Sequence, residues 1–213
     1  MRSSLQAHLG KPQWDDLLEA RRSVLAAIRS ESRWTTGKYV KNRELKGGRD
    51  FGGSESGARY LPATQRYTGT LYKEAPTLAD NASNEESKRS TVLVVSALYG
   101  LLHPDDEIQN YNLQMSESPA YRTWKQTLPE TLLNFVTRNA VSEMFLLFGP
   151  STAYLKVVMK ALSPDLKRVV PRIVHFDVQS GSSYKTPQRH GQVLNYLLSG
   201  KRGQVADVAE KIV

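Results

Sequence analysis

Hydrophobic positions recur with the period of a helix near the start of the chain. In "WDDLLEARRSVLAAIR", residues 14–29, the leucine, valine and isoleucine side chains fall three, four or seven positions apart, so they share one face of an α-helix. Asp15 and Asp16 stand near the amino end, where the helix dipole favours negative charge. The pattern therefore predicts a helix over 14–29.

This helical period disappears between residues 30 and 60, where glycine, serine, lysine and arginine accumulate. A polar segment of this kind, without a hydrophobic face, is typical of a loop. We therefore expect a mobile, basic, glycine-rich loop over about 30–60. Its two glycine pairs follow no predicted strand and open no helix, so a phosphate-binding loop is disfavoured.

Three apolar runs in the rest of the chain have the length and composition of short buried strands. They cover residues 91–97, 143–149 and 171–178. Helices are expected between and after these runs, two of them beginning at prolines that a first helical turn tolerates. The expected helices cover residues 119–127, 129–138, the stretch after 152, and 186–198. Alternating strands and helices predict a single α/β domain over 1–213, with a mixed, partly parallel sheet flanked by helices.

The composition narrows the chemistry that this domain can perform. The chain has 213 residues, no cysteine and four histidines, which disfavours a disulfide framework, a thiol nucleophile and a zinc site. We expect no metal and no cofactor. No apolar run approaches the roughly 20 residues of a transmembrane helix, and the first residues lack the apolar middle of a signal peptide. The sequence therefore predicts a soluble cytoplasmic protein with no membrane partner.

The net charge of +8 favours a polyanionic partner, because each lysine or arginine placed on a phosphate releases a counterion. Basic residues are concentrated in the glycine-rich segment, and tyrosines that could stack on bases follow it. A basic surface that serves only solubility is the alternative. The candidate nucleic-acid-binding residues are Arg33, Lys38, Lys41, Arg43, Lys46, Arg49, Tyr67 and Tyr72.

Polar side chains follow each of the three predicted strands. If the strands are parallel, their carboxyl ends share one rim and these side chains frame a cleft. Ser151 and Thr152 stand where a helix begins and could bind an anion or only cap that helix. Asp105 and Asp106 could instead form a solvated turn, and His175 could be a hydrogen-bonded residue of the cleft wall. The candidate catalytic residues are Ser96, Tyr99, Asp105, Asp106, Tyr111, His175 and Asp177.

Three segments carry a resemblance to a known family: "PATQRYTGTLYKEA", "VLVVSALYGLLHPDDEIQNYNLQM" and "YRTWKQTLPETL". They resemble the YaaA family of peroxide-stress proteins. The resemblance implies a compact mixed α/β fold, DNA binding and a role in limiting iron-driven oxidative damage. Asn112 and Gln114 stand where that family has an arginine and a glutamate. The matching positions are Tyr67, Gly69, Tyr72, Ser96, Tyr99, Gly100, Pro104, Ile108, Tyr111 and Met115.

The back half is also similar in pattern to the uracil-DNA glycosylase fold. "EMFLLFGPSTAYLKVV" resembles that fold's strand ending at a glycine, and "VHFDVQSGSSYKTPQRHGQVLNYLL" resembles a strand that leads through a loop to a helix. This likeness implies a nucleobase-sized cleft, and it places His175 near that family's functional histidine.

Two hypotheses of function follow from these observations. The first is a YaaA-like DNA-binding protein of the oxidative stress response. The second is an enzyme that acts on a nucleobase, nucleoside or nucleotide, by glycosidic or group-transfer chemistry, in a cleft at the carboxyl ends of the strands. The expected partner is accordingly DNA or a nucleotide-like ligand, and a protein adapter that docks through residues 30–60 is a third possibility.

Overall fold

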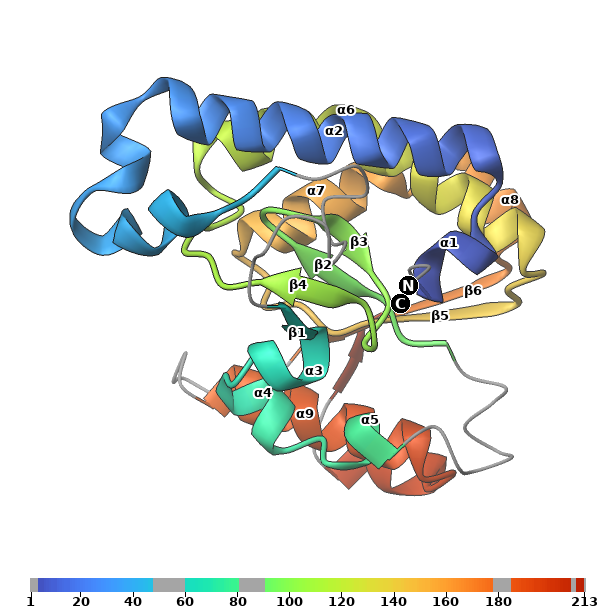
Figure 1. Ribbon diagram of the computed structural model, residues 1–213. Helices are drawn as coiled ribbons and strands as arrows, with labels where there is room; N and C mark the ends of the chain where they lie inside the picture. Colours follow the sequence, from blue (N-terminus) through green and yellow to red (C-terminus); the bar gives the residue numbers. More distant parts are fainter. Residues whose placement is uncertain (1–3, 48–59, 81–90, 178–184, 208–209, 213) are drawn as a thin grey trace.

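The computed structural model describes residues 4–47, 60–80, 91–177, 185–207 and 210–212. In these parts the strands lie between two groups of helices (Figure 1), with α2, α6, α7 and α8 on one side and α4, α5 and α9 on the other. The α-helices are α1 Ser4–His8, α2 Lys11–Ser30, α3 Ala63–Arg66, α4 Thr70–Lys73, α5 Thr77–Asp80, α6 Ser118–Arg138, α7 Ala153–Ala161, α8 Pro164–Val169 and α9 Lys185–Leu198. The 3-10 helices are η1 Ser32–Thr35, η2 Gly37–Glu44 and η5 Arg202–Asp207.

The described strands form three small sheets. The strands are β1 Tyr60–Pro62, β2 Val94–Ser96, β3 Gly100–Leu102, β4 Glu107–Gln109, β5 Glu143–Leu146, β6 Arg172–Asp177 and β7 Glu210–Ile212. β5 and β6 pair in parallel, and β7 joins β6 antiparallel. β2 pairs with β3 and β1 pairs with β4, both antiparallel. The predicted α/β class, with a partly parallel sheet flanked by helices, is confirmed.

The first apolar run, residues 91–97, does not share a rim with the other two predicted strands. β2 turns within three residues into β3, with Ser96 opposite Gly100. The turn closes because Tyr99 N donates to Ser96 Oγ at 3.0 Å and Gly100 takes a positive φ of 71°, which only glycine adopts without steric cost. β2 is therefore paired with β3 in a sheet that β5 and β6 do not share.

Residues 118–138 form one helix, α6, where two helices were expected. Pro129 lies inside it, although a proline there lacks the N–H of a regular helical hydrogen bond. The buried face continues across the proline, from Trp124 and Leu128 to Leu132 and Phe135. We infer that continuous packing of this face keeps the helix unbroken.

The largest core cluster runs from α1 through α2 and α6 to α8. α2 and α6 lie side by side in it (Figure 1), and the predicted helix over 14–29 is confirmed within α2. Two smaller clusters lie under α9, around Val193 and Leu194. Among the described residues, none of the helices combines the length and apolar character needed to cross a membrane.

Candidate functional site

Three hydroxyl groups from separate parts of the chain meet at a hydroxyl triangle formed by Tyr67, Ser96 and Tyr111. Tyr67 donates to Ser96 Oγ at 3.1 Å, and the Tyr67 and Tyr111 hydroxyl oxygens lie 2.9 Å apart. The Ser96 and Tyr111 oxygens are also 2.9 Å apart. The structure thus brings together two predicted catalytic residues and one predicted base-stacking residue.

The phenols around this triangle are held neutral. Burial raises the pKa of Tyr67 well above its ordinary value and also raises the pKa of Tyr111. Burial likewise raises the pKa values of Tyr72, Tyr99 and Tyr154. A neutral phenol donates and accepts hydrogen bonds but is no base near neutral pH. The triangle can therefore bind a polar group without removing a proton from it.

Tyr72 stacks on Tyr67, with ring centroids 5.4 Å apart and planes 24° apart. Both rings are largely buried and pack on the main core cluster. These two predicted base-stacking tyrosines therefore stack on each other.

Tyr99 holds the turn region together. Its hydroxyl accepts a hydrogen bond from Gln109 N at 2.9 Å. The guanidinium of the buried Arg21 donates to the Tyr99 carbonyl oxygen at 2.8 Å and to the Leu101 carbonyl oxygen at 2.7 Å. Tyr99 is only 1% exposed, so its hydroxyl forms hydrogen bonds inside the protein rather than with a ligand.

Within the loop predicted over about 30–60, residues 32–46, called the basic segment below, are not irregular, and residues 48–59 of that loop lie outside the described part of the chain. η1 and η2 occupy most of the basic segment, and Asn42, only 2% exposed, anchors it. Asn42 Nδ2 donates to the Trp34 and Asn112 carbonyl oxygens, both at 2.9 Å, and Asn112 N donates back to Asn42 Oδ1 at 2.8 Å. Asn112 Nδ2 also donates to the Lys38 carbonyl oxygen.

A second clamp holds the end of the basic segment. Lys46 N donates to Gln109 Oε1, and Gln109 Nε2 donates to the Lys46 carbonyl oxygen, both at 2.8 Å. Sequence reasoning missed Asn42 and Gln109. Asn42 bonds to backbone atoms of Asn112, which every residue type has, so the sequence carries no signal for this anchor. Gln109 and Asn112 thus fix the basic segment, while Tyr111 between them enters the hydroxyl triangle.

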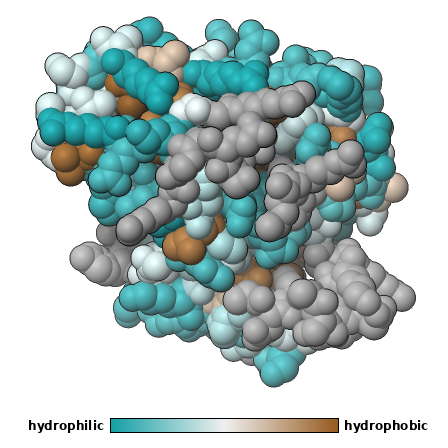
Figure 2. All heavy atoms as spheres, in the orientation of Figure 1, coloured by the Kyte–Doolittle hydropathy of each residue, from teal (hydrophilic) through white to brown (hydrophobic). Residues whose placement is uncertain are grey.

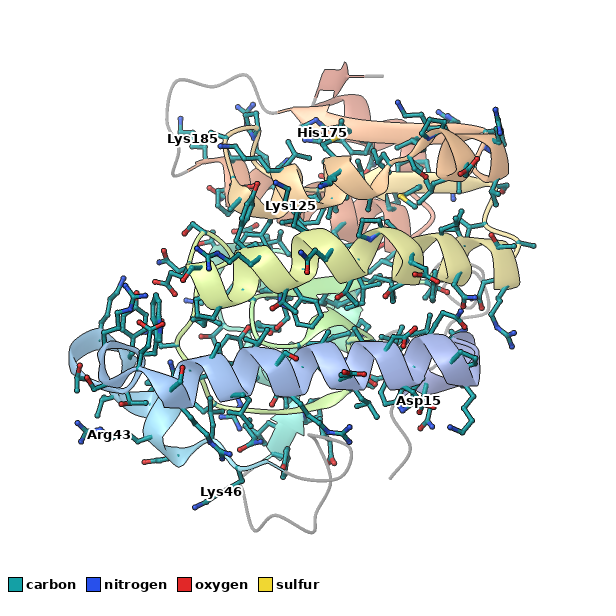
Figure 3. All side chains as sticks on the ribbon, turned by 90° about the horizontal axis from the view of Figure 1, so that it is seen from above. Asp15, Arg43, Lys46, Lys125, His175 and Lys185 are labelled. Atoms are coloured by element: carbon teal, nitrogen blue, oxygen red, sulfur yellow. The ribbon has the colours of Figure 1, made fainter. Side chains whose placement is uncertain are left out.

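Side chains of the basic segment point outward. Arg33, Lys38, Lys41, Arg43 and Lys46 are all exposed, and Arg43 and Lys46 project from the same side of the molecule (Figure 3). Hydrophilic side chains cover the neighbouring face over α2 (Figure 2).

Some of these cations have partners within the protein. Arg33 Nε lies 2.7 Å from Glu31 Oε2, and Lys38 Nζ lies 3.4 Å from Glu117 Oε1. The predicted nucleic-acid-binding residue Arg49 lies outside the described residues.

The two candidate aspartates have different environments. Asp106 is 4% exposed, and its carboxylate accepts hydrogen bonds from His103 N at 2.9 Å and Leu5 N at 3.3 Å. Asp105 is exposed, and its carboxylate lies 3.5 Å from His103 Nδ1. Asp106 therefore ties α1 to the turn before β4, and Asp105 has the exposure of a solvated turn residue.

The candidates of the back half lie apart from the basic segment. His175 Nε2 is 2.9 Å from the Phe148 carbonyl oxygen, and Figure 3 places this residue on the opposite side from Arg43 and Lys46. Thr152 caps α7 by accepting from Leu155 N at 3.2 Å, as one sequence alternative predicted, and Ser151 beside it is exposed. Asp177 ends β6, and its side chain lies outside the described part.

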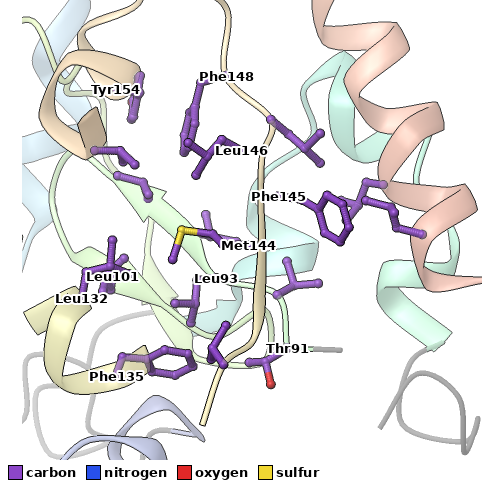
Figure 4. A pocket seen from close by; sticks show the side chains of 18 of the residues that line it. Thr91, Leu93, Leu101, Leu132, Phe135, Met144, Phe145, Leu146, Phe148 and Tyr154 are labelled. Carbon is purple, nitrogen blue, oxygen red and sulfur yellow. The ribbon is translucent and has the colours of Figure 1, made fainter. Parts of the chain in front are cut away.

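The tyrosines border an apolar cavity of about 830 Å³ (Figure 4). Tyr67, Tyr72, Tyr111 and Tyr154 contribute to its wall. One carboxylate is found among the described lining residues, that of Glu143, and it is ion-paired with two arginines. Around the triangle, the described lining side chains therefore supply hydrogen bonds and apolar contacts.

Comparison with known proteins identifies relatives of the chain. It is 24% identical over 163 residues to a UPF0246 protein of Fusobacterium nucleatum, a match that covers 72% of this chain and 60% of that protein. It is 29% identical over 138 residues to a UPF0246 protein of Ruegeria sp. and 28% identical over 135 residues to one of Delftia acidovorans. These two matches cover 61% and 59% of this chain, and 53% and 49% of the relatives.

The chain thus spans between about half and three fifths of the length of these relatives. The profile of a family described as "Peroxide stress protein YaaA" matches residues 18–210, a range that contains the hydroxyl triangle and the basic segment. The chain therefore belongs to the YaaA family of peroxide-stress proteins.

Proposed function

We propose that this chain binds DNA as part of the peroxide stress response. The observation that carries the proposal is the basic segment, which presents exposed cationic side chains while Asn42 and Gln109 fix its backbone to the protein. An anchored segment loses less conformational entropy on binding than a mobile loop would. The family description supplies the biological context.

Phosphate contacts would dominate this binding. Each cation that neutralises a phosphate of duplex DNA contributes about 0.9 to the slope of log affinity against log salt. Lys41 and Lys46 are exposed members of the basic segment. If both contact phosphate, replacing them by glutamine lowers the magnitude of the slope by about 1.8.

The test compares this double variant with a matched control. Lys41→Gln with Lys46→Gln removes two charges from the basic segment, and Lys160→Gln with Lys167→Gln removes two from exposed positions on α7 and α8. Binding of short duplex DNA is measured by fluorescence anisotropy across a salt series. We expect weaker binding and a shallower slope for the first variant, and wild-type behaviour for the second. Equal effects of the two variants would refute a localised interface.

The hydroxyl triangle favours a second candidate, an enzyme that acts on a nucleobase, nucleoside or nucleotide. Its phenols could hold a polar ligand, but burial keeps them neutral. General acid–base catalysis works best with a group that titrates near the working pH, so we rank this candidate second. A nucleoside that raises the melting temperature of the wild type, but not of Tyr111→Phe, would reverse the ranking.

A further inference from the structure

Tyr39 in η2 is paired with the carboxylate of Glu117, the residue directly before α6. The Tyr39 hydroxyl donates a hydrogen bond to Glu117 Oε1, and Glu117 Oε2 accepts one from Gln114 N at 2.7 Å. The Glu117 side chain is only 11% exposed, and Tyr39 is half-buried. The phenols of the hydroxyl triangle, by contrast, hydrogen-bond to other hydroxyl groups. The Tyr39 hydroxyl therefore has a proton acceptor that the protein holds in place.

Trp34 is an aromatic neighbour of Tyr39. The two ring centroids lie 5.1 Å apart, with an interplanar angle of 70°. Trp34 is buried, and its Nε1 has no hydrogen-bond partner within the described part of the chain. Of these two rings in contact, the phenol can pass its proton directly to an acceptor and the indole cannot.

A cation lies over each of these rings. Lys38 Nζ is 4.6 Å from the Tyr39 ring centroid, and Arg33 Cζ is 4.6 Å from that of Trp34. An aromatic ring that loses one electron becomes a radical cation, which a neighbouring positive charge repels. Loss of the ring's own proton removes this repulsion, because it leaves a neutral radical. One-electron oxidation of the pair therefore favours Tyr39, whose proton can move to Glu117.

We propose that Tyr39 is a redox-active tyrosine that reduces negatively charged one-electron oxidants. One electron passes from the phenol to the oxidant, and the hydroxyl proton passes to the Glu117 carboxylate. The O–H bond of Tyr39 breaks and an O–H bond forms on Glu117, so the products are a neutral phenoxyl radical, a neutral carboxyl group and the reduced oxidant. A proton acceptor must lie within hydrogen-bonding reach of the proton that it takes, and Glu117 does.

The charge of the basic segment favours an anionic oxidant. Exposed cations flank Tyr39 in the sequence, among them Lys38 and Lys41, and a cluster of one sign of charge raises the rate at which ions of the opposite sign arrive. Because Tyr39 is half-buried, the oxidant can react at the surface without entering the protein. The step requires no DNA, so it does not depend on the proposed DNA binding.

The test mixes the protein with the hexachloroiridate(IV) dianion, a one-electron oxidant, and follows the loss of its visible absorbance by stopped flow. Tyr39→Phe keeps the ring beside Trp34 but removes the hydroxyl, and Glu117→Gln removes the carboxylate. Tyr121→Phe is the matched control, because Tyr121 is also half-buried and has Lys125 Nζ 5.6 Å from its ring centroid. We expect the fastest phase to be unchanged in Tyr121→Phe, absent in Tyr39→Phe and about 100-fold slower in Glu117→Gln.

The opposite results would overturn the proposal. A fastest phase that persists in Tyr39→Phe, or that is lost equally in Tyr121→Phe, would show that another residue reduces the oxidant. Movement of the phenolic proton also predicts a slower fastest phase for the wild type in D₂O, a measurement that does not depend on the folding of any variant. Equal rates in H₂O and D₂O, or an unchanged rate in Glu117→Gln, would exclude proton transfer to Glu117.

Charge variants test the class of oxidant. Lys41→Gln with Lys46→Gln removes two cations from the basic segment and should slow the reaction with the dianion. Lys160→Gln with Lys167→Gln removes two exposed cations from α7 and α8 and should leave the rate unchanged. Equal rates for the two double variants would overturn the assignment of an anionic oxidant. Loss of DNA binding with a normal fastest phase would refute the proposed function and leave the redox site standing.

Discussion

Replacing Gly100 by alanine tests how the β2–β3 turn is built. Gly100 has a φ of +71°, and a Cβ built on it would lie 2.7 Å from Trp124 Cε3 and closer still to Cζ3. Trp124 is fully buried, and its Nε1 donates to the Ala97 carbonyl oxygen at 2.8 Å. The indole cannot move away without losing that hydrogen bond. Gly100→Ala therefore combines backbone strain with a steric clash.

The two contributions can be estimated separately. A non-glycine residue in the left-handed region costs about 1–2 kcal/mol, and overpacking a well-packed site costs about 1–3 kcal/mol. We expect Gly100→Ala to lower the free energy of unfolding by about 2–5 kcal/mol. A loss of that size is a large fraction of the roughly 5–15 kcal/mol that stabilises a typical domain.

Two other glycines serve as controls. Gly37 has a φ of +54° but no heavy atom within 4 Å of a built Cβ, so Gly37→Ala carries strain alone and should cost about 1–2 kcal/mol. Gly203 has neither feature, and its alanine variant should stay within about 0.5 kcal/mol of wild type. Urea unfolding followed by circular dichroism measures all three. Equal losses at Gly100 and Gly37 would show that Trp124 does not crowd the turn.

Three further predictions concern the anchors and the buried phenols. Asn42→Ala should cost about 1–3 kcal/mol and speed hydrogen exchange in η2, because the hydrogen bonds of the Asn42 amide to the Trp34 and Asn112 backbone are lost; unchanged exchange would contradict the anchor. Asp106→Ala should lower the melting temperature, whereas the exposed Asp105→Ala should not; equal effects would refute this distinction. Burial raises the pKa of Tyr111 in the folded protein, so the contribution of this tyrosine to stability is present below about pH 10 and is lost as pH rises further. Tyr111→Phe should therefore make unfolding less dependent on pH in the alkaline range, measured by tyrosinate absorbance. An identical pH profile for the variant and the wild type would contradict this prediction.

The sequence by itself determined part of the local structure. The helical period of residues 14–29 predicted the core of α2, the apolar runs predicted β5 and β6, and helix 186–198 was observed as Lys185–Leu198. The cap before α7 was also readable. These features depend on residues close together in the chain, and local periodicity and turn chemistry specify them.

Tertiary structure alone decided which of these elements meet. β2 paired with its own neighbour β3 instead of sharing a rim with β5 and β6. The basic segment is fixed because the Asn42 side chain donates a hydrogen bond to the carbonyl oxygen of Asn112, 70 residues away. The hydroxyl triangle assembled from Tyr67, Ser96 and Tyr111. Composition cannot reveal such choices, because the free energy that selects them comes from burial and hydrogen bonding between residues distant in sequence, which override local propensity.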